Sequence, residues 1–263
     1  MGKVIAVTNQ KGGVGKTTTS VNLAASLVAT KRTVLLLDLD PQGNATTGSG
    51  VDKNNIASSI YEVLIGDSDI STSRIKTEAG FDLLPSNGDL TAAEIVLLEL
   101  ENKEYRLKNA INLVRNQYDY LIIDCPPSLN MLTVNAMVAS DSVMIPMQCE
   151  YYALEGLAAL METIEKIRFA LNPKLQIDGL LRTMFDPRNS LSNDVSRHLI
   201  KQFQNKVYRT IIPRNVRLAE APSHGMPVLA YDRRSRGAVC YLALAGELIR
   251  RAEQESKATA VPA

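Results

Sequence analysis

The sequence predicts an α/β fold, in which a doubly wound and mainly parallel sheet is flanked by helices on both faces. Short apolar runs alternate with stretches of helical periodicity along the chain, which is the pattern of such folds. The apolar runs are nearly continuous, as strands covered on both faces are. Glycine-rich and acidic segments follow several runs, and ligands of such sheets bind beyond the carboxyl ends of the strands.

Each predicted element follows from its local pattern. The apolar run at 3–7 precedes a glycine-rich turn, and helical spacing of apolar residues follows at 17–28. A second buried strand at 33–39 leads into a predicted loop at 41–53, which is rich in Gly, Asn and Thr. The strand at 120–123 stops before two prolines, which a central strand excludes. The other predicted strands are 81–84, 142–145, 175–184 and 208–212, and the other predicted helices are 56–65, 91–116, 129–139, 153–171, 193–203 and 235–254.

Length and composition indicate one soluble domain, which we place at 1–254, followed by a flexible tail at 255–263. The 263 residues are 45% hydrophobic and 22% charged, as in ordinary globular proteins. Three cysteines stand far apart without a C-x-x-C pair, which argues against a metal knuckle or redox pair and fits a reducing cytoplasm. The first strand leaves no room for a signal peptide, and no apolar run reaches the ~18 residues that a membrane span needs.

Positive charge is concentrated late in the chain. The formal net charge is +1, but residues 182–236 hold nine Arg and two Lys against three Asp and one Glu, a balance of +7. This concentration indicates either an anionic partner or an ordinary solvated face, and composition leaves both interpretations open.

A phosphate-binding loop is predicted between the first strand and the first helix. Glycines let backbone N–H groups turn toward phosphate oxygens, and the helix N-terminus adds partial positive charge. Lys16 would reach the β- and γ-phosphates, and the Thr17 hydroxyl would ligate Mg²⁺. These features predict binding and hydrolysis of ATP with Mg²⁺. The predicted loop residues are Lys11, Gly12, Gly13, Val14, Gly15, Lys16, Thr17 and Thr18.

Two further strand ends carry carboxylates suited to this chemistry. Asp38 and Asp40 end the second predicted strand, where a carboxylate can orient a water toward the γ-phosphate or hold a magnesium-bound water. Of the two we favour Asp40, since Asp38 could instead cap the strand end. Asp124 ends an apolar strand in the Walker B pattern, and we expect it to hold Mg²⁺ through water. The predicted metal-site residues are therefore Thr17, Asp40 and Asp124.

One departure from the general loop pattern points to a family. The position six residues before Lys16 is Gln10 instead of glycine, and a second lysine, Lys11, follows it. This K-G-G-x-G-K-[ST] form resembles the deviant Walker A motif of the ParA/MinD family of ATPases. Longer segments at 148–156, 212–225 and 231–238 are similar to those of chromosomal ParA (Soj) partitioning proteins. The resemblance covers nearly the whole chain.

The resemblance implies roles in hydrolysis. In that family the extra lysine, here Lys11, reaches across a dimer interface to the partner's nucleotide. The second aspartate of the D-x-D-P-Q-G-N segment, here Asp40, is the hydrolytic residue. Lys11, Lys16 and Asp40 would then form the catalytic set, with weak intrinsic activity because the switch segments offer no evident arginine finger. Glu150 would touch the nucleotide near the dimer interface.

The resemblance also implies partners. The family's ATP-bound homodimer binds double-stranded DNA without sequence preference, and a ParB-type protein stimulates hydrolysis while chromosomes or plasmids are segregated. Positions that match its DNA contacts are Arg188, Arg214 and Arg217, which lie in the basic segment; a surface ion pair is the alternative for each. Pro213 and Asn215 would form the adenine pocket. Such a protein is cytoplasmic and nucleoid-associated.

Other classes fit less well. The main alternative is a MinD-like or other cargo-positioning ATPase that acts at a membrane or a protein scaffold. A membrane-binding member ends in a basic amphipathic helix, whereas 250–263 offers two Arg, one Lys and almost no large apolar residues, so we expect no membrane contact. An iron–sulfur protein would need suitably spaced cluster cysteines, and a related tyrosine kinase a Tyr-rich tail; the sequence has neither. A non-catalytic scaffold is disfavoured by the full set of Lys16, Thr17, Asp40 and Asp124.

Overall fold

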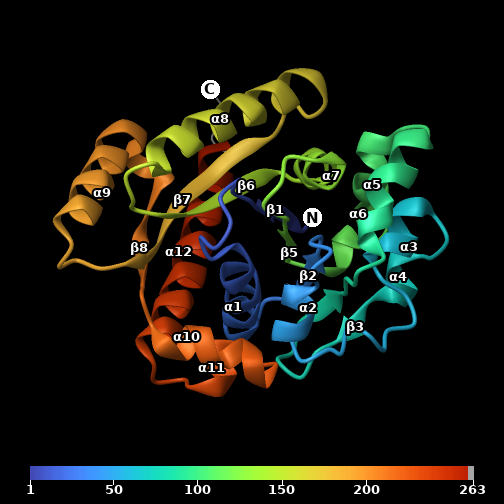
Figure 1. The fold of residues 1–263 in the computed structure, drawn as a ribbon, viewed down its shortest axis with the longest axis horizontal. Helices are drawn as coiled ribbons and strands as arrows, with labels where there is room; N and C mark the ends of the chain where they lie inside the picture. Colours follow the sequence, from blue (N-terminus) through green and yellow to red (C-terminus); the bar gives the residue numbers. More distant parts are fainter. Residues whose placement is uncertain (260–263) are drawn as a thin grey trace.

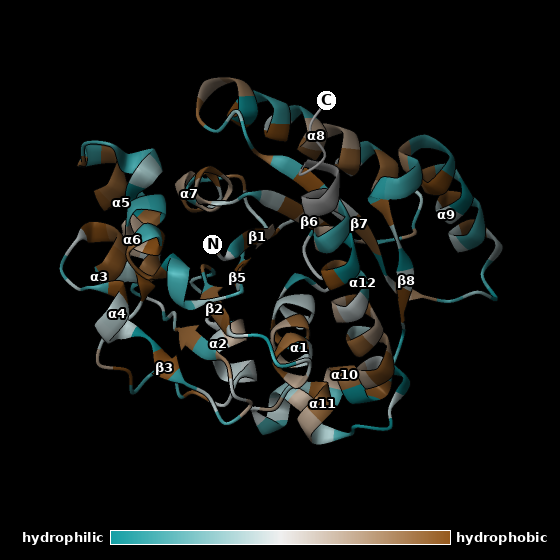
Figure 2. Ribbon diagram, turned by 180° about the vertical axis from the view of Figure 1, so that it is seen from behind, coloured by the Kyte–Doolittle hydropathy of each residue, from teal (hydrophilic) through white to brown (hydrophobic). Residues whose placement is uncertain are grey.

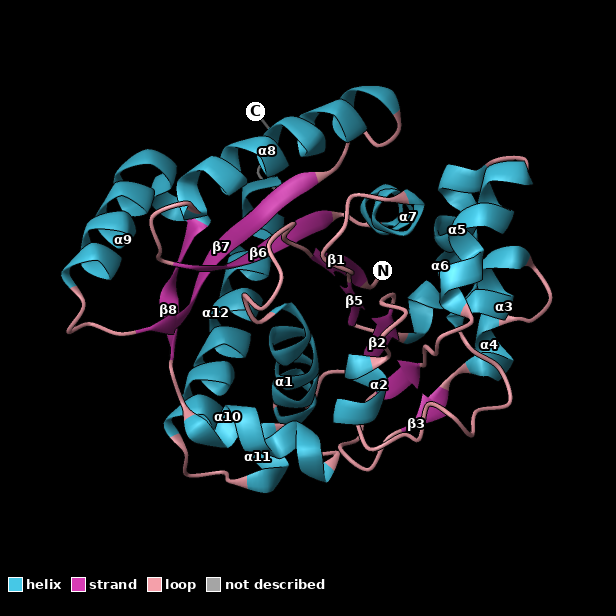
Figure 3. Cartoon of the chain, viewed as in Figure 1, coloured by secondary structure: helices cyan, strands magenta, loops and turns pink. Residues whose placement is uncertain are grey.

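The computed structural model describes residues 1–259, with side chains described through residue 254. In this part of the chain eight strands form one sheet in the order β3-β4-β2-β5-β1-β6-β7-β8 (Figure 1, Figure 3). Neighbouring strands are parallel except at one edge, where β3 runs antiparallel to β4. The predicted doubly wound, mainly parallel sheet is confirmed. The strands are β1 (Lys3–Val7), β2 (Val34–Asp38), β3 (Ile75–Lys76), β4 (Asp82–Leu84), β5 (Tyr120–Asp124), β6 (Ser142–Gln148), β7 (Gln176–Phe185) and β8 (Val207–Pro213).

Helices cover both faces of the sheet (Figure 1). One face packs against α1 and α12, and the other packs against α3, α5, α6 and α7 at one end and α8 and α9 at the other. The α-helices are α1 (Lys16–Ala29), α2 (Asn44–Gly48), α3 (Ile60–Ile65), α4 (Ile70–Ser73), α5 (Leu90–Glu99), α6 (Arg106–Val114), α7 (Met131–Ala139), α8 (Ala153–Ala170), α9 (Ser190–Phe203), α10 (Val216–Glu220), α11 (Val228–Tyr231) and α12 (Arg236–Thr259). Four short 3₁₀ turns are η1 (Lys103–Tyr105), η2 (Arg115–Gln117), η3 (Gln204–Lys206) and η4 (Ala221–His224).

The central strands are apolar throughout because they bury both faces. On β2, Val34 and Leu36 pack in the cluster with α1 and α12, while Leu35 and Leu37 pack in the opposite cluster. This alternation follows from the two-residue period of a strand. Figure 2 shows the hydrophobic stretches of the strands enclosed between the helices. The continuous apolar runs in the sequence are thus explained.

All seven predicted strands are confirmed, and β6 continues beyond its predicted end at 145 through Pro146. The carbonyl of Met144 accepts from the N–H of Thr8, so the next residue on that side of β6 is Pro146. By then β1 has ended, and the missing N–H of proline interrupts no ladder. The Pro146 carbonyl instead accepts from Asn9 Nδ2 at 2.8 Å.

The single helix predicted at 91–116 is wrong, because the chain breaks between α5 and α6. Leu100 is extended and Asn102 adopts a left-handed conformation with φ 53°. Asn135 on α7 stabilises the break from outside. Its Nδ2 donates to the Lys103 carbonyl at 2.8 Å, and its Oδ1 accepts from the Leu107 N–H at 3.1 Å. Because Asn135 is distant in sequence from the break, its contacts leave no trace in the hydrophobic periodicity of residues 91–116.

Smaller elements were also not predicted. The predicted loop at 41–53 contains α2, and α4, α10, α11 and strand β3 lie in stretches without a clear period. None of the helices in the described part is long and apolar enough to cross a membrane. The predicted tail at 255–263 stays a prediction: α12 is assigned to Thr259, and residues 260–263 lie outside the described residues.

Candidate nucleotide-binding site

The sheet order brings the predicted phosphate loop and carboxylates to one place. β5 lies between β1 and β2, with Val7 and Asp38 both in register with Asp124. The carboxyl ends of these three parallel strands therefore coincide. The segments that follow β1 and β2 meet beside Asp124, as the strand-end rule for open α/β sheets predicts.

The loop from Lys11 to Gly15 leads into the N-terminus of α1. Gly13 (φ 72°) and Gly15 (φ 88°) adopt left-handed conformations that favour glycine. A Cβ added at Gly12 or Gly13 would meet nothing within 4 Å, so this chain leaves the outer side of the loop open. The open loop and the helix N-terminus form a cradle suited to phosphate oxygens.

Two side chains that sequence analysis missed hold this loop in place. Asn9 accepts from the Lys11 N–H at 3.0 Å and, through Nδ2, ties the loop to β6. Thr183, near the end of β7, donates its hydroxyl to the Val14 carbonyl at 2.7 Å. Thr183 is remote in sequence, and its only signal is its position close to a strand end.

Lys16 is directed into the site and is only 7% exposed. Its Nζ donates to the Lys11 carbonyl at 3.2 Å. Burial lowers the pKa of Lys16, while the negative charges of Asp124 and Asp40 oppose that shift. The structure thus brings together three residues predicted from separate motifs.

Asp124 is fully buried at the centre of the site. Its Oδ1 accepts from the Ser20 hydroxyl at 2.8 Å, and Thr17 also donates to this carboxylate. Burial, and then the nearby charge of Asp38, raise the pKa of Asp124 to about 8. Its Oδ2 has no hydrogen-bond partner within the described chain. A buried acceptor without a partner, beside a threonine hydroxyl, fits a Mg²⁺ ion with its water shell.

Asp38 and Asp40 differ in what their oxygens do. Asp38 Oδ2 accepts from both the N–H and the hydroxyl of Thr46, each at 2.8 Å, so it anchors the start of α2. Burial is the main cause that raises the pKa of Asp38 to about 6. Asp40 uses Oδ1 for the Gln42 N–H at 2.9 Å, while Ser86 holds its backbone carbonyl at 2.8 Å. Asp40 therefore has a fixed backbone and a charge that acts on Lys16, and no hydrogen bond to its Oδ2 is found among the described residues.

Lys11 extends along the open side of the loop. Its Nζ forms an ion pair with Glu150 Oε2 at 2.5 Å, and the two side chains are 45% and 51% exposed. Glu150 follows β6, the strand next to β1, so the pairing results from the sheet order. The sequence predicted both residues but not this contact.

Comparisons with known proteins agree with this geometry. A family profile described as an AAA domain matches residues 2–177. The sporulation initiation inhibitor protein Soj of Bacillus subtilis is 54% identical over 94% of this chain and 98% of its own length. The chromosome partitioning protein ParA of Caulobacter vibrioides is 49% identical over 98% of this chain and 97% of its own.

The chain belongs to the ParA/Soj family of P-loop ATPases.

A solved relative carries the expected ligands. Cobyrinic acid a,c-diamide synthase from Mycobacterium smegmatis, determined with bound ADP and magnesium, has a TM-score of 0.85, 38% identity and 96% coverage of both chains. Nucleotide and Mg²⁺ are thus bound by this fold, and the loop, Lys16 and Asp124 of this ParA/Soj family member fit both groups.

The other predicted positions lie apart from the phosphate loop. β8 is the third strand from β1; of the predicted adenine-pocket residues, Pro213 is its last residue and Asn215 follows its end. Asn215 Oδ1 caps α10 by accepting from the Leu218 N–H at 3.2 Å, so its role at adenine stays a prediction.

Two of the three arginines predicted to contact DNA, Arg188 and Arg217, form ion pairs within the chain. Arg188 is 89% exposed and binds Asp186 through two hydrogen bonds of 2.9 and 2.8 Å, which lower the pKa of that carboxyl to about 2. Arg214 is also exposed, and its charge acts on the same aspartate. Arg217 pairs with Glu220 at 2.8 Å and Asp232 at 3.4 Å. The predicted DNA contacts therefore gather near β8 with acidic partners that sequence analysis did not assign.

Proposed function

We propose that this chain is a ParA-type ATPase that dimerises when it binds ATP, binds double-stranded DNA without sequence preference, and segregates chromosomes or plasmids with a ParB-type partner that stimulates hydrolysis. The observation that carries this proposal is the position of Lys11, half-exposed on the open side of a phosphate loop that already has Lys16 inside. Because Lys16 already neutralises the phosphates bound in the same subunit, we infer that Lys11 acts on the nucleotide of a second subunit.

Within one subunit, the groups needed for slow phosphoryl transfer are in place. Lys16 neutralises charge on the β- and γ-phosphates, and Asp40 orients the attacking water with its free oxygen. Thr17 and Asp124 would hold Mg²⁺, which supplies further neutralisation of phosphate charge. Intrinsic activity is weak, because the group that completes the site comes from a second subunit.

A second copy of the chain supplies that group. Lys11 exchanges Glu150 for the partner's nucleotide, and Glu150 is then free to approach the nucleotide near the interface. Exposed apolar side chains lie close in sequence to these segments: Leu129 is 49% exposed, and Tyr151 and Tyr152 are 71% and 72% exposed. Burial of such side chains would favour association.

Dimerisation also gates DNA binding. Each subunit presents Arg188, Arg214 and Arg217, and a dimer doubles the number of phosphates that can be neutralised. Affinity for DNA depends steeply on that number. Contacts of this kind carry no sequence information, so binding is non-specific and the protein is cytoplasmic and nucleoid-associated. Pro213 and Asn215 are proposed to hold the adenine.

A mixing experiment tests the cross-subunit role of Lys11. Lys11→Ala and Asp40→Ala chains, each inactive alone, are mixed before ATP is added, and phosphate release is measured. A mixed dimer holds one site with an intact Asp40 and a lysine from its partner. Activity should recover to at most about a quarter of wild type, since about half of the dimers are mixed and each has one complete site.

The matched control replaces Lys11→Ala with Lys16→Ala. Lys16 acts on the nucleotide of its own subunit, so this mixture should stay inactive. Absence of recovery with Lys11→Ala as well, in mixtures shown by sedimentation to contain dimers, would place Lys11 in its own subunit's site and contradict the proposal.

A further inference from the structure

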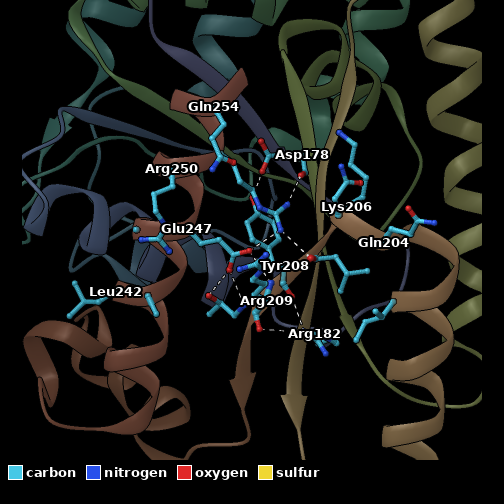
Figure 4. Close-up of a pocket in the computed structure, with 17 residues that line it drawn as sticks. Asp178, Arg182, Gln204, Lys206, Tyr208, Arg209, Leu242, Glu247, Arg250 and Gln254 are labelled. Atoms are coloured by element: carbon cyan, nitrogen blue, oxygen red, sulfur yellow. Dashed lines mark hydrogen bonds and ion pairs between the residues drawn. The ribbon is translucent and has the colours of Figure 1, made fainter. Parts of the chain in front are cut away.

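A cavity that the predicted nucleotide site does not include lies at the β8 edge of the sheet (Figure 4). It has a volume of about 960 Å³ and is lined by β7, β8, the end of α9 with η3, and one side of α12. β8 is an edge strand, three positions from β1 in the sheet. None of the predicted nucleotide or DNA-contacting residues belongs to the lining. The proposed function leaves this cavity unexplained.

Both carboxylates of the lining are satisfied by groups of the chain itself. Glu247 on α12 accepts from the N–H groups of Arg209 and Thr210, each at 2.9 Å, and pairs with Arg251 at 2.8 Å. Asp178 on β7 pairs with Lys3 at 2.7 Å and accepts from the Tyr208 hydroxyl. Figure 4 shows the bonds of Glu247, which join β8 to α12. Neither acid is available to neutralise the other cations of the cavity.

The lining holds five cationic side chains against these two acids: Arg182, Lys206, Arg209, Arg250 and Arg251. Arg209 and Arg250 are exposed, and neither forms an ion pair within the described part of the chain. Lys206 Nζ donates to the Ile177 carbonyl at 2.9 Å and forms no ion pair with a described residue. The cavity therefore carries an excess of positive charge that the described residues do not neutralise.

Arg182 adds a buried cation to this wall. It is 6% exposed, and its guanidinium donates to Ser196 Oγ at 2.9 Å and to the Tyr208 carbonyl at 2.8 Å. Its Nε has no partner within the described chain. Burying a guanidinium whose partners are neutral acceptors, and one of whose donors is unused, costs free energy unless an anion offsets the charge.

We propose that this cavity binds a small molecule that carries a phosphate group. Guanidinium groups bind phosphate through paired hydrogen bonds, and a phosphate monoester brings a charge near −2 to match the excess. The volume lies within the range of about 300–1,000 Å³ that is usual for small-molecule sites. A DNA duplex is too wide to enter a cavity of this size, whereas a terminal phosphate can approach its walls. The site is separate from the ATP site and does not depend on the proposed function.

Calorimetric titration of the full chain carrying Lys16→Ala tests the proposal, because that change disables the phosphate loop. Ribose 5-phosphate, AMP and inorganic phosphate are the probes. We expect the two organic phosphates to bind with a Kd of about 1 mM or tighter. Arg209→Gln and Arg250→Gln should each weaken binding about tenfold or more. Arg168→Gln, which changes a partly exposed arginine on α8 that pairs with Glu165, should leave binding unchanged.

The other outcomes of this titration either support the phosphate site or overturn it. If inorganic phosphate binds as tightly as the two organic phosphates, and Arg209→Gln and Arg250→Gln weaken its binding by the same factor, the site is supported and free phosphate is its ligand. Absence of binding by all three probes, or binding that neither arginine change weakens, would overturn the proposal. Displacement of the probes by short duplex DNA, weakened by the same two substitutions, would assign the surface to nucleic acid instead.

Discussion

Ser20 offers a sharp test of the proposed metal site, because the chain supplies a matched control on the same helix. Ser20 and Ser26 are both fully buried on α1. The Ser20 hydroxyl donates to Asp124 at 2.8 Å, whereas Ser26 Oγ has no hydrogen-bond partner among the residues that the structure describes. Replacing either by alanine removes one oxygen and little volume. The two variants therefore differ mainly in whether a hydrogen bond to Asp124 is lost.

The size of the effect follows from that bond. A hydrogen bond to a charged group contributes about 1.5–3 kcal/mol, and loss of a group that supports a metal ligand typically costs about 10- to 100-fold in metal affinity. Ser20→Ala should raise the Mg²⁺ concentration for half-maximal ATP hydrolysis by about that factor. Ser26→Ala removes a buried hydroxyl that has no partner in the described part of the chain, so Mg²⁺ dependence should not change and the free energy of unfolding should stay equal or rise.

Mg²⁺ titrations of phosphate release at fixed ATP, together with urea unfolding of each variant, provide the measurement. Unfolding separates a damaged helix from a weakened metal site. A half-maximal Mg²⁺ concentration in Ser20→Ala equal to that of wild type, or an equal shift in Ser26→Ala, would refute the assignment of Asp124.

Further outcomes are expected for single substitutions. Lys16→Ala should abolish ATP binding; normal affinity for a fluorescent ATP analogue would remove Lys16 from the site. Asp40→Ala should accumulate an ATP-bound dimer on a sizing column, and undiminished hydrolysis would clear Asp40 of its role. Arg217→Ala should weaken binding to all duplex sequences alike while the dimer persists, and a loss confined to one sequence would contradict backbone contacts. Gly179→Ala should lower the free energy of unfolding by about 1–3 kcal/mol, since a Cβ there would lie 2.6 Å from a tyrosine ring. Gly156→Ala, near the start of α8 with nothing within 4 Å, should raise the free energy of unfolding by up to about 1 kcal/mol. If urea unfolding gave the reverse order for the two variants, this interpretation of the packing would be refuted.

Features that depend on local chemistry were predictable from the sequence. Buried strands appear as apolar runs, and the phosphate loop is recognisable from the fixed spacing of its glycines and Lys16. Asp124 follows from its place at the end of an apolar strand. These predictions need only a few neighbouring residues, so a single sequence contains the information.

Features that depend on distant contacts were not predictable. Thr183 reaches the phosphate loop from another strand, and Asn135 stabilises the break between α5 and α6 from a different helix. Ser20 lies one turn after Lys16, but its contact with Asp124 requires knowing that β5 is next to β1. Arg188 was predicted from charge and family resemblance, yet its tight pairing with Asp186 emerged only with the loop geometry.

The most direct test of the account is binding to random-sequence duplex DNA with ATP, with ADP and without nucleotide, at two salt concentrations. ATP-gated dimerisation predicts tight binding with ATP alone, and a fall in affinity of several orders of magnitude between about 50 and 200 mM salt. Equal DNA affinity in all three nucleotide states would show that DNA binding does not depend on ATP-driven dimerisation, and would contradict the account. No binding in any state, with ATP still bound, would contradict the proposed link between the basic surface and nucleic acid.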